Sequence, residues 1–357
     1  MYNYKITLAM PVYNVEKYIE CALLSALNQT YENIEFIVVD DRGTDNSMVI
    51  VNDIIAHHPR GKDVKIIEHE RNIGTGATRN TAIAHAAGKY IFFMDSDDEI
   101  TPDCISILYE KMQETPVDFV AASHKDAVID GQYNKYFTSQ TYPVYPDMLI
   151  PKANLGVAKE YFKRRYPLVA VFTWNKLYNL DFLKNNNIAC IPHHLAEDIF
   201  FTYQVILKAQ SCRLLSNITY YYYKTGGTGT VYNTITPPRA AKTFEEIIIA
   251  EINYSQNFSE AVFYPTMIRR ILASVIYFTT CVYKSRMISL EEKKAYILNM
   301  LNLSLEKIQK VFPIYAIPVQ LIRKTTNIKL KIFLAKYFNK IFLMRALIKI
   351  FSLLRKR

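Results

Sequence analysis

The sequence lacks the cysteine pattern of a disulfide-held domain or of a zinc site. Its 357 residues hold five cysteines, an odd number that is widely scattered and contains no Cys-x-x-Cys pair. This spacing excludes a disulfide framework and a structural zinc site. A chain that keeps its thiols reduced fits the cytosol, which is the compartment that we expect.

Long apolar runs and a secretion signal are also missing. Two apolar stretches without charge, residues 271–283 and 311–322, are shorter than the roughly 20 residues that a helix needs to span a bilayer. The first residues lead into a strand pattern without the basic start and apolar core of a signal peptide. We therefore expect a cytoplasmic chain that has no transmembrane helix and is not exported.

Acidic residues are absent from the last part of the chain. None follows Glu306, although this part carries 13 of the 43 lysines and arginines. Residues 1–306 therefore sum to 30 − 33 = −3, while the whole chain is formally +10. The basic surplus lies in the tail, and the body is slightly acidic.

The basic tail alternates lysine and arginine with isoleucine, leucine and phenylalanine from residue 328 onward. Lys329, Lys336 and Lys340 share one helical face and the later basic residues fall nearly opposite, which favours two helices or a break near Asn339. Such a tail suits an anionic membrane surface, and the alternative is a helix pair packed on the rest of the protein. Nucleic-acid binding is disfavoured, because the body is net acidic and no helix-turn-helix or zinc-finger signature is present.

Short apolar runs alternate with helical patterns in the first third of the chain. Strands are predicted at residues 6–10, 34–39, 64–67 and 90–94, and helices at residues 15–27, 48–55 and 77–87. This alternation predicts an α/β fold with a mixed, mainly parallel sheet flanked by helices. Ligands of such sheets bind beyond the carboxyl ends of the strands, so polar residues at those ends are candidates for function.

The second half of the chain is less regular. A strand is predicted at residues 119–122 and a helix at residues 197–208, and the pattern is helical from residue 239 onward.

Three carboxylates follow the fourth predicted strand directly. Asp95, Asp97 and Asp98 stand within four residues of one another and would repel unless a cation lies between them. Hard oxygen ligands suit magnesium or manganese, and such an ion would hold a diphosphate. A solvated turn or a helix cap is the alternative.

Polar residues also follow the other strands. Asp40 and Asp41 end the second strand, where a carboxylate can accept the ring N–H of a pyrimidine or the hydroxyls of a ribose. Tyr13 follows the first strand and offers a ring for a base to stack on, unless it serves ordinary packing. Residues 71–77 carry two glycines that allow close backbone approach to a phosphate, although glycine turns before helices are common.

Together these segments resemble the family-2 inverting glycosyltransferases in order and spacing. The similarity is close over roughly residues 4–125, looser over about residues 174–230, and lapses in the helical tail. It rests on Met10-Pro11-Val12-Tyr13-Asn14, Val38-Val39-Asp40-Asp41, Asn72-Ile73-Gly74 with Arg79-Asn80, Gly88-Lys89-Tyr90-Ile91, and Met94-Asp95-Ser96-Asp97-Asp98.

The resemblance implies a GT-A fold, the Rossmann-like fold of nucleotide-diphospho-sugar transferases. Its catalytic domain would cover residues 1–235, with a nucleotide-sugar half at about 1–125 and an acceptor half at about 126–235. Residues 236–357 would form a helical C-terminal region that ends in the basic amphipathic tail.

The resemblance also assigns roles to individual residues. Asp198, within Glu197-Asp198, would be the catalytic base, and Asp97 would bind a manganese or magnesium ion. The residues expected to contact the nucleotide-sugar are Pro11, Val12, Tyr13, Asn14, Asp40, Asn72, Gly74, Arg79, Asp95, Asp98 and Lys224.

The implied reaction moves a sugar, most often from a UDP-sugar, to a lipid-linked or polysaccharide acceptor. The enzyme would be a hexosyltransferase of cell-surface or capsule polysaccharide biosynthesis, held peripherally at the inner face of the plasma membrane. Homo-oligomer formation stays open. Two alternatives remain, a nucleotidyltransferase on a related α/β scaffold and a nucleotide-sugar or membrane-binding protein without turnover.

The sequence departs from the family pattern in two places. Arg42 stands where small residues are common, and it would face solvent or pair with Asp41 or a phosphate. Lys224 stands where arginine is more usual, so a phosphate contact there would be less bidentate. The segment Trp174-Asn175-Lys176-Leu177 resembles one near the acceptor side, and the alternative is a buried strand with one solvated lysine.

Overall fold

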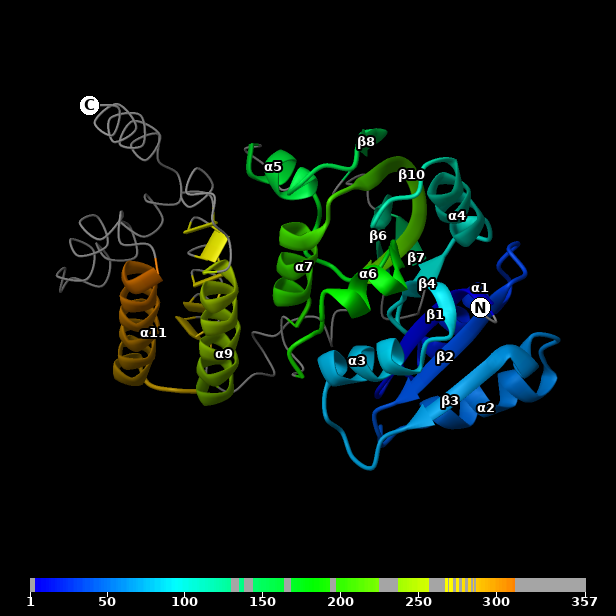
Figure 1. The fold of residues 1–357 in the computed structure, drawn as a ribbon. Helices are drawn as coiled ribbons and strands as arrows, with labels where there is room; N and C mark the ends of the chain where they lie inside the picture. The colour runs from blue at the N-terminus through cyan, green and yellow to red at the C-terminus, as the bar shows by residue number, and fades with distance from the viewer. Residues whose placement is uncertain are drawn as a thin grey trace. The chain divides into compact units, whose positions relative to one another are not determined.

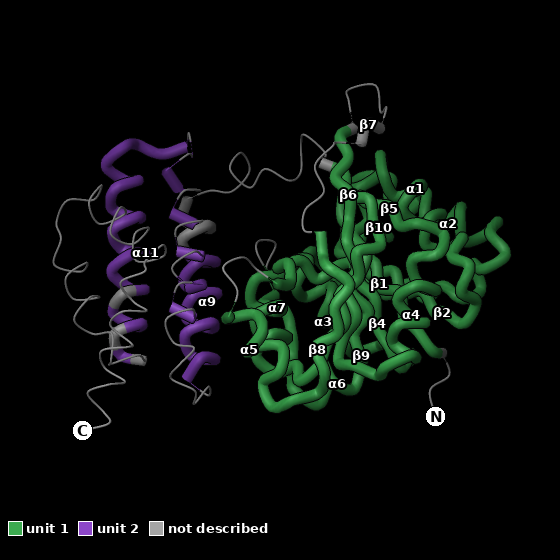
Figure 2. The backbone as a smooth tube through the Cα atoms, turned by 90° about the horizontal axis from the view of Figure 1, so that it is seen from above, with its two compact units in different colours: residues 1–229 green, residues 230–357 purple. Residues whose placement is uncertain are grey.

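The described residues form two compact units. The computed structural model describes residues 4–129, 135–137, 144–163, 168–192, 197–224, 237–256, scattered residues between 267 and 285, and 287–311. The units cover residues 1–229 and 230–357 and are coloured separately in Figure 2, and each is described by itself. The basic tail expected to contact a membrane, with its break near Asn339, lies outside the described residues.

A mixed sheet of ten strands forms the centre of the first unit (Figure 1). The main path follows the order β3-β2-β1-β4-β9-β6-β10-β5, while β7 pairs with β6 and β8 pairs with β10. The strands are β1 (Tyr4–Val12), β2 (Ile34–Asp40), β3 (Val64–Glu68), β4 (Gly88–Phe93), β5 (Glu99–Ile100), β6 (Phe119–Ile129), β7 (Lys135–Phe137), β8 (Met148–Ile150), β9 (Lys176–Asn179) and β10 (Cys212–Lys224).

The N-terminal half of the sheet is parallel, as the alternating pattern predicts. β1 pairs in parallel with β2 and β4, and β2 pairs in parallel with β3. Antiparallel pairs involve the later strands: β9 lies between β4 and β6 and runs against both, whereas β10 runs parallel to β6. The carboxyl ends of β1, β2 and β4 therefore share one edge of the sheet, which is where the candidate residues of the first half lie.

Helices cover both faces of this sheet (Figure 1). In the first unit they are α1 (Ile19–Leu27), α2 (Ser47–His57), the 3₁₀ turn η1 (Gly61–Asp63), α3 (Thr75–His85), α4 (Cys104–Glu114), α5 (Gly156–Lys163), α6 (Leu180–Asn185) and α7 (Glu197–Lys208). The bounds of α7 are those predicted from the sequence.

The two faces follow from the alternation of side chains along a strand. Leu8 and Met10 of β1 pack with Leu23 of α1 and Leu108 of α4 in one buried cluster. Phe93 of β4 points to the other face, where its ring centre lies 5.9 Å from that of Phe201 in α7. The sheet is thus a buried middle layer, and α7 reaches the same strand that leads into the aspartate turn.

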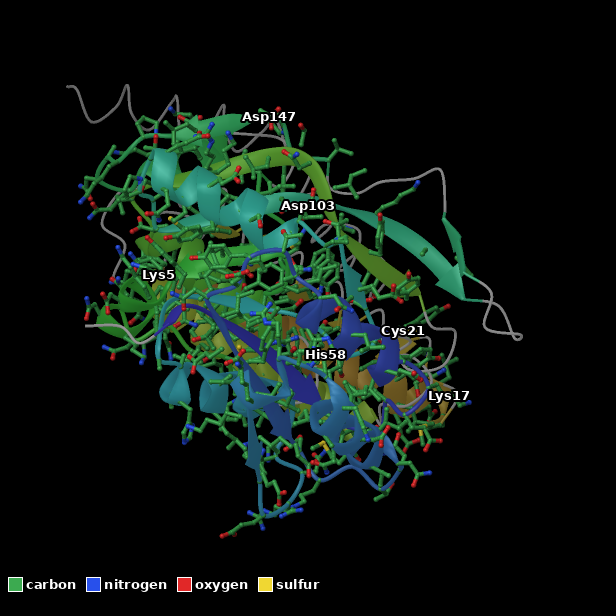
Figure 3. All side chains as sticks on the ribbon, turned by 90° about the vertical axis from the view of Figure 1, so that its right-hand side faces the viewer. Lys5, Lys17, Cys21, His58, Asp103 and Asp147 are labelled. Atoms are coloured by element: carbon green, nitrogen blue, oxygen red, sulfur yellow. The ribbon has the colours of Figure 1, made fainter. Side chains whose placement is uncertain are left out.

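The described cysteines form no disulfide. Cys104, Cys190 and Cys212 are buried free thiols, whereas Cys21 is exposed on α1 (Figure 3). Burial raises the pKa of the three buried thiols, so they are neutral and act as small apolar residues.

The second unit is helical where it is described. It contains α9 (Pro237–Ser255) and α11 (Leu290–Val311), which contact each other. Glu251 of α9 is fully buried, and Arg270 Nε lies 3.5 Å from its carboxylate. Burial raises the pKa of Glu251 to about 7. Among the helices that the structure describes, none combines the length and the apolar character needed to cross a membrane.

Candidate active site

The turn after β4 gathers three carboxylates at the edge of the sheet. Oxygen atoms of Asp95, Asp97 and Asp98 all lie within 4.8 Å of one another. Asp98 is buried, and its two oxygens accept hydrogen bonds of 2.8 Å from the Tyr220 hydroxyl and the Tyr223 N–H. Strand β10 of the second half therefore fixes the turn that the first half supplies.

Charge crowding in this turn shifts its pKa values. Burial, with the nearby Asp95 charge, raises the pKa of Asp97 to about 7. Burial and both neighbouring aspartates raise the pKa of Asp98 well above its usual range. Closely spaced carboxylate oxygens with little positive charge nearby are suitable ligands for a divalent cation.

A buried arginine connects this turn to a distant helix. Arg79 lies on α3, and its Nη2 is 2.7 Å from Asp95 Oδ1. Its Nη1 donates to Glu197 Oε1 at the start of α7, 118 residues away in sequence. The guanidinium, only 4% exposed, thus brings the aspartate turn and the Glu197-Asp198 segment to one place.

The start of α7 carries two carboxylates in different electrostatic settings. Glu197 is paired with Arg79, whereas Asp198 makes no ion pair with any described residue. Burial, with the adjacent Glu197 charge, raises the pKa of Asp198 to about 7. Asp198 is therefore a carboxyl group able to exchange a proton near neutral pH.

Lys176, the first residue of β9, is a buried lysine. Its side chain is not solvated, so that alternative from the sequence is wrong: Lys176 is 2% exposed, and its Nζ donates to the Phe172 carbonyl. Burial lowers the pKa of Lys176 to about 7, and the Asp198 charge acts in the opposite direction. The sequence offered no signal that this lysine faces inward.

The carboxylate of Asp40 lies at the end of β2 beside Arg42. Asp40 Oδ1 accepts the Arg42 N–H at 2.8 Å, and Arg42 Nη1 is 3.8 Å from Asp40 Oδ2. Arg42 also pairs with Glu68 at 2.9 Å. Its ion-pair partners are thus Asp40 and Glu68, not Asp41, and its Nε donates to the His69 carbonyl at 2.5 Å. The side chain keeps an exposed part.

Asp41 holds the loop around Gly74 in place, a role that its sequence position does not reveal. Its carboxylate accepts the N–H groups of Ile73 and Gly74 at 2.9 Å each, and His69 Nδ1 lies 2.8 Å from its Oδ1. His69 Nε2 reaches Thr81 of α3 at 2.9 Å. Asp41 therefore holds the glycine loop, where Gly74 adopts a φ of 98° that favours glycine.

The other predicted donor-binding residues line the same edge or carry free donors there. Tyr13 follows β1 and is 44% exposed, and Asn14 has a φ of 53° and accepts the Thr44 N–H at 2.7 Å. The Asn72 amide nitrogen and Arg79 Nε are buried without a hydrogen-bond partner among the described residues. Such buried, unpaired donors are costly unless a ligand accepts from them.

Three further predicted residues contribute less to the described site. Pro11 and Val12 are the last residues of β1 and pair with Val39 and Asp40 of β2. Val12 is buried, so only its backbone can meet a ligand. Lys224 ends β10, and its side chain lies outside the described residues.

Comparison with known proteins gives a consistent result. Residues 7–184 match the family model described as Glycosyl transferase family 2. The chain is 35% identical over 231 residues to the poly(ribitol-phosphate) beta-glucosyltransferase of Bacillus spizizenii, covering 61% of this chain and 32% of that one. It is 32% identical over 221 residues to the glycosyltransferase GlyA of Streptococcus pneumoniae, covering 61% and 30%. The chain spans about a third of the length of these relatives.

Solved structures with the same fold include TarS 1–349 of S. aureus. Its TM-score with this chain is 0.66 at 21% sequence identity, over 94% of this chain and 91% of that one. The same TarS segment in complex with UDP-GlcNAc gives a TM-score of 0.67 at 22% identity, over 94% and 92%. This likeness, with the observed sheet, confirms the predicted GT-A fold.

The Asp41 network predicts a stability cost for loss of one carboxylate oxygen. In Asp41→Asn the new amide N–H would face a backbone N–H of Ile73 or Gly74, leaving a buried donor unpaired. We expect a loss of about 1–3 kcal/mol in the free energy of unfolding, measured by urea denaturation. The matched control is Asp53→Asn on the exposed surface of α2, where the change should stay within about 0.5 kcal/mol. Equal losses in the two variants would show that Asp41 does not hold the loop.

Proposed function

Because residues 7–184 belong to glycosyl transferase family 2, we propose that this chain is an inverting glycosyltransferase that uses a nucleotide-sugar. The donor class that we propose is a UDP-sugar, and the acceptor is a saccharide or lipid-linked saccharide of a cell-surface polymer. Two relatives support this choice: one is named for poly(ribitol-phosphate), and TarS has been solved with UDP-GlcNAc.

The observation that carries the proposal is the meeting of two carboxylate segments through Arg79. The turn with Asp95 and Asp97 can help to offset negative charge on the departing diphosphate. The segment with Asp198 can take the proton of the acceptor hydroxyl. Sugar transfer with inversion needs these two functions on opposite sides of one anomeric carbon. A fold that buries an arginine between them keeps both at a fixed separation.

The donor would lie along the ends of β1, β2 and β4. Tyr13 offers an exposed ring for the base, and Asp40 offers a carboxylate oxygen for a ring N–H or a ribose hydroxyl. The unpaired Asn72 amide and Arg79 Nε are donors that phosphate or ribose oxygens would satisfy.

The aspartate turn fits a divalent cation, which we propose to be manganese or magnesium. Asp97 would be its principal ligand, with Asp95 towards the ribose and Asp98 held by β10 nearer the sugar. The raised pKa of Asp97 supports this, because a cation would relieve the repulsion that causes it. Such an ion offsets negative charge that grows on a leaving diphosphate.

Asp198 is the proposed base. It would accept the proton of the acceptor hydroxyl as that oxygen attacks the anomeric carbon from the face opposite the nucleotide. Its pKa of about 7 lies near the working pH of a cytoplasmic enzyme, which favours proton transfer. Glu197 is held by Arg79 and is less able to take this part.

The donor proposal predicts metal-dependent binding of UDP. UDP should raise the melting temperature of the chain, and manganese should increase the shift, because a ligand that binds only the folded state stabilises it by mass action. Asp97→Asn should abolish the part that manganese adds. Asp103→Asn, at an exposed position before α4 (Figure 3), should retain it.

GDP, CMP and dTDP are the comparison ligands for this experiment. A larger rise in melting temperature with one of them would assign that nucleotide, in place of UDP, to the donor. A UDP shift that manganese does not change would contradict the cation site, and no shift with any nucleotide would contradict nucleotide-sugar binding.

The base proposal predicts a variant that binds donor but does not transfer. Asp198→Asn should keep the shift with UDP and manganese and lose roughly 10²–10⁴-fold in transfer rate, because the amide cannot accept the proton. UDP release from UDP-glucose or UDP-GlcNAc with poly(ribitol phosphate) as acceptor measures it. Asp181→Asn on the exposed start of α6 is the control and should transfer normally. Transfer by Asp198→Asn at the native rate would place the base elsewhere.

We further propose that the chain binds peripherally to an anionic membrane surface, at the inner face of the plasma membrane. The support is the sequence of the tail, where 13 basic residues and no acidic one follow Glu306. The full chain should sediment with vesicles of phosphatidylglycerol and phosphatidylcholine at low salt and less so at high salt. Replacing Lys329, Lys336 and Lys340 by glutamine should weaken sedimentation.

The control for this experiment replaces three exposed lysines of the first unit, Lys5, Lys62 and Lys65, by glutamine (Lys5 is labelled in Figure 3). Equal weakening by both sets would indicate a general charge effect and contradict a membrane role of the tail.

A further inference from the structure

Four aromatic side chains stack on one another beside the aspartate turn. The ring centre of Phe172 lies 4.4 Å from that of Trp174, at an interplanar angle of 6°. Tyr220 of β10 stacks on Trp174 at 4.5 Å and 12°, and Tyr222 of the same strand at 5.5 Å and 13°. Near-parallel rings at these spacings attract one another beyond their buried area. We call these four residues the ring stack.

His124 of β6 supports the ring stack from the sheet. Its ring meets Trp174 edge to face, with centres 4.9 Å apart and an angle of 89°, and meets Phe172 in the same way at 5.7 Å. His124 is 3% exposed and lies opposite Tyr220 in the parallel pairing of β6 and β10. The position of the rings is therefore fixed by two neighbouring strands.

The ring stack is buried in part and reaches the surface in part. Tyr220 is fully buried and Trp174 is 5% exposed, so these two belong to the core. Phe172 and Tyr222 are only partly buried, and their rings are near-parallel, with an angle of 19° and centres 6.4 Å apart. Part of each of these two rings can thus meet a ligand.

Hydrogen bonds attach the ring stack to the aspartate turn. The Tyr220 hydroxyl donates to Asp98 Oδ2 at 2.8 Å and accepts the Asp95 N–H at 3.1 Å. The N–H of Tyr223, next to Tyr222, donates to Asp98 Oδ1 at 2.8 Å. The stacked rings of β10 therefore lie directly beside the turn that is proposed to serve the diphosphate of the donor.

The Phe172 segment is attached to the other carboxylate segment. Thr202 of α7 donates to the carbonyl of Val171, the residue before Phe172, at 2.5 Å. Thr202 follows Asp198 by four residues, so the two lie on the same face of α7. The ring stack is thus bonded both to the aspartate turn and to the helix that carries the proposed base.

The chemistry of a pyranose ring suits this position. An acceptor that reacts between the aspartate turn and Asp198 has to lie close to the segment that joins them. A pyranose with equatorial hydroxyls carries C–H groups on its faces, and these are attracted to the negative face of an aromatic ring. An open-chain polyol offers no such flat face.

We propose that Phe172 and Tyr222, supported from behind by Trp174, bind a pyranose ring of the acceptor by stacking. This inference rests on the proposed function, which makes the saccharide beside Asp198 the acceptor. It adds the chemical class of the acceptor residue and two side chains that contact it.

The first test uses the fluorescence of Trp174, which is the only tryptophan in the chain. Its emission therefore reports on the ring stack alone when tryptophan is excited selectively. Cellotriose and N-acetylchitotriose, two chains of pyranoses with equatorial hydroxyls, should each give a saturable change in emission with the full chain. Sorbitol, an open-chain polyol, should give none. No saturable change with either trisaccharide, or an equal change with sorbitol, would overturn the proposal.

Variants separate binding from packing. Phe172→Leu and Tyr222→Leu retain an apolar side chain but lose the ring face, so each should weaken trisaccharide binding about 2–10-fold, as expected for one aromatic contact. Phe172→Tyr retains the ring and should bind normally. Tyr283→Leu, at a 64% exposed position of the second unit, is the control and should also bind normally.

A lower melting temperature of the two leucine variants with unchanged trisaccharide binding would assign the rings a packing role and overturn the proposal. If one leucine variant does not fold, the other variant and the wild-type titration still decide.

The nucleotide readout distinguishes this inference from the proposed function. Phe172→Leu should keep the melting-temperature shift that UDP and manganese give, because the ring contacts the acceptor and not the donor. Loss of that shift in a folded variant would place the rings in the donor site and overturn the proposal. If no nucleotide binds the wild-type chain, the proposed function fails, while Trp174 emission still reports whether the rings bind a saccharide. If UDP binds but neither trisaccharide changes the emission, this inference alone fails.

Discussion

The buried ion pairs of Arg79 are the constraint on which the rest of the site depends. Its guanidinium contacts Asp95 after β4 and Glu197 at the start of α7, two segments that no strand pairing connects directly. Removal of one partner from a buried ion pair leaves an uncompensated charge, so the three residues have to be placed together. The same contacts occupy Glu197 and leave Asp198 as the carboxylate beside it that can exchange a proton.

Charge balance explains why so many pKa values are shifted in one small region. The site holds the five carboxylates of Asp95, Asp97, Asp98, Glu197 and Asp198 and the two buried cations Arg79 and Lys176, a formal excess of 5 − 2 = 3 negative charges. Burial in such a field raises the pKa of Asp97, Asp98 and Asp198. A divalent cation would remove most of the excess, which makes the arrangement typical of a site completed by its ligands.

The sequence predicts well which strand ends form the site, but it does not predict which side chains pair with one another there. Periodicity finds the strands, and a short polar segment after a strand marks the sheet edge, so Asp40, Asp95 and Asp97 could be placed there from sequence alone. The inward-facing Lys176 and the loop-holding Asp41 could not, because their partners come from other elements through tertiary packing. Arg42 illustrates the same limit: its position is visible in the sequence, but the choice of Asp40 and Glu68 as partners depends on how β2 and β3 lie side by side.

The two halves of the first unit, residues 1–125 and 126–229, are therefore not independent modules joined by a linker. Asp98 belongs to the first half by sequence, yet Tyr220 and Tyr223 of β10 hold both of its oxygens. Glu197 belongs to the second half, yet Arg79 of α3 holds it. Each half thus supplies a charged group whose position is fixed by the other. Because buried ion pairs and hydrogen bonds tolerate little displacement, a shift of α7 or β10 relative to β4 would disturb the aspartate turn and the Asp198 carboxylate together.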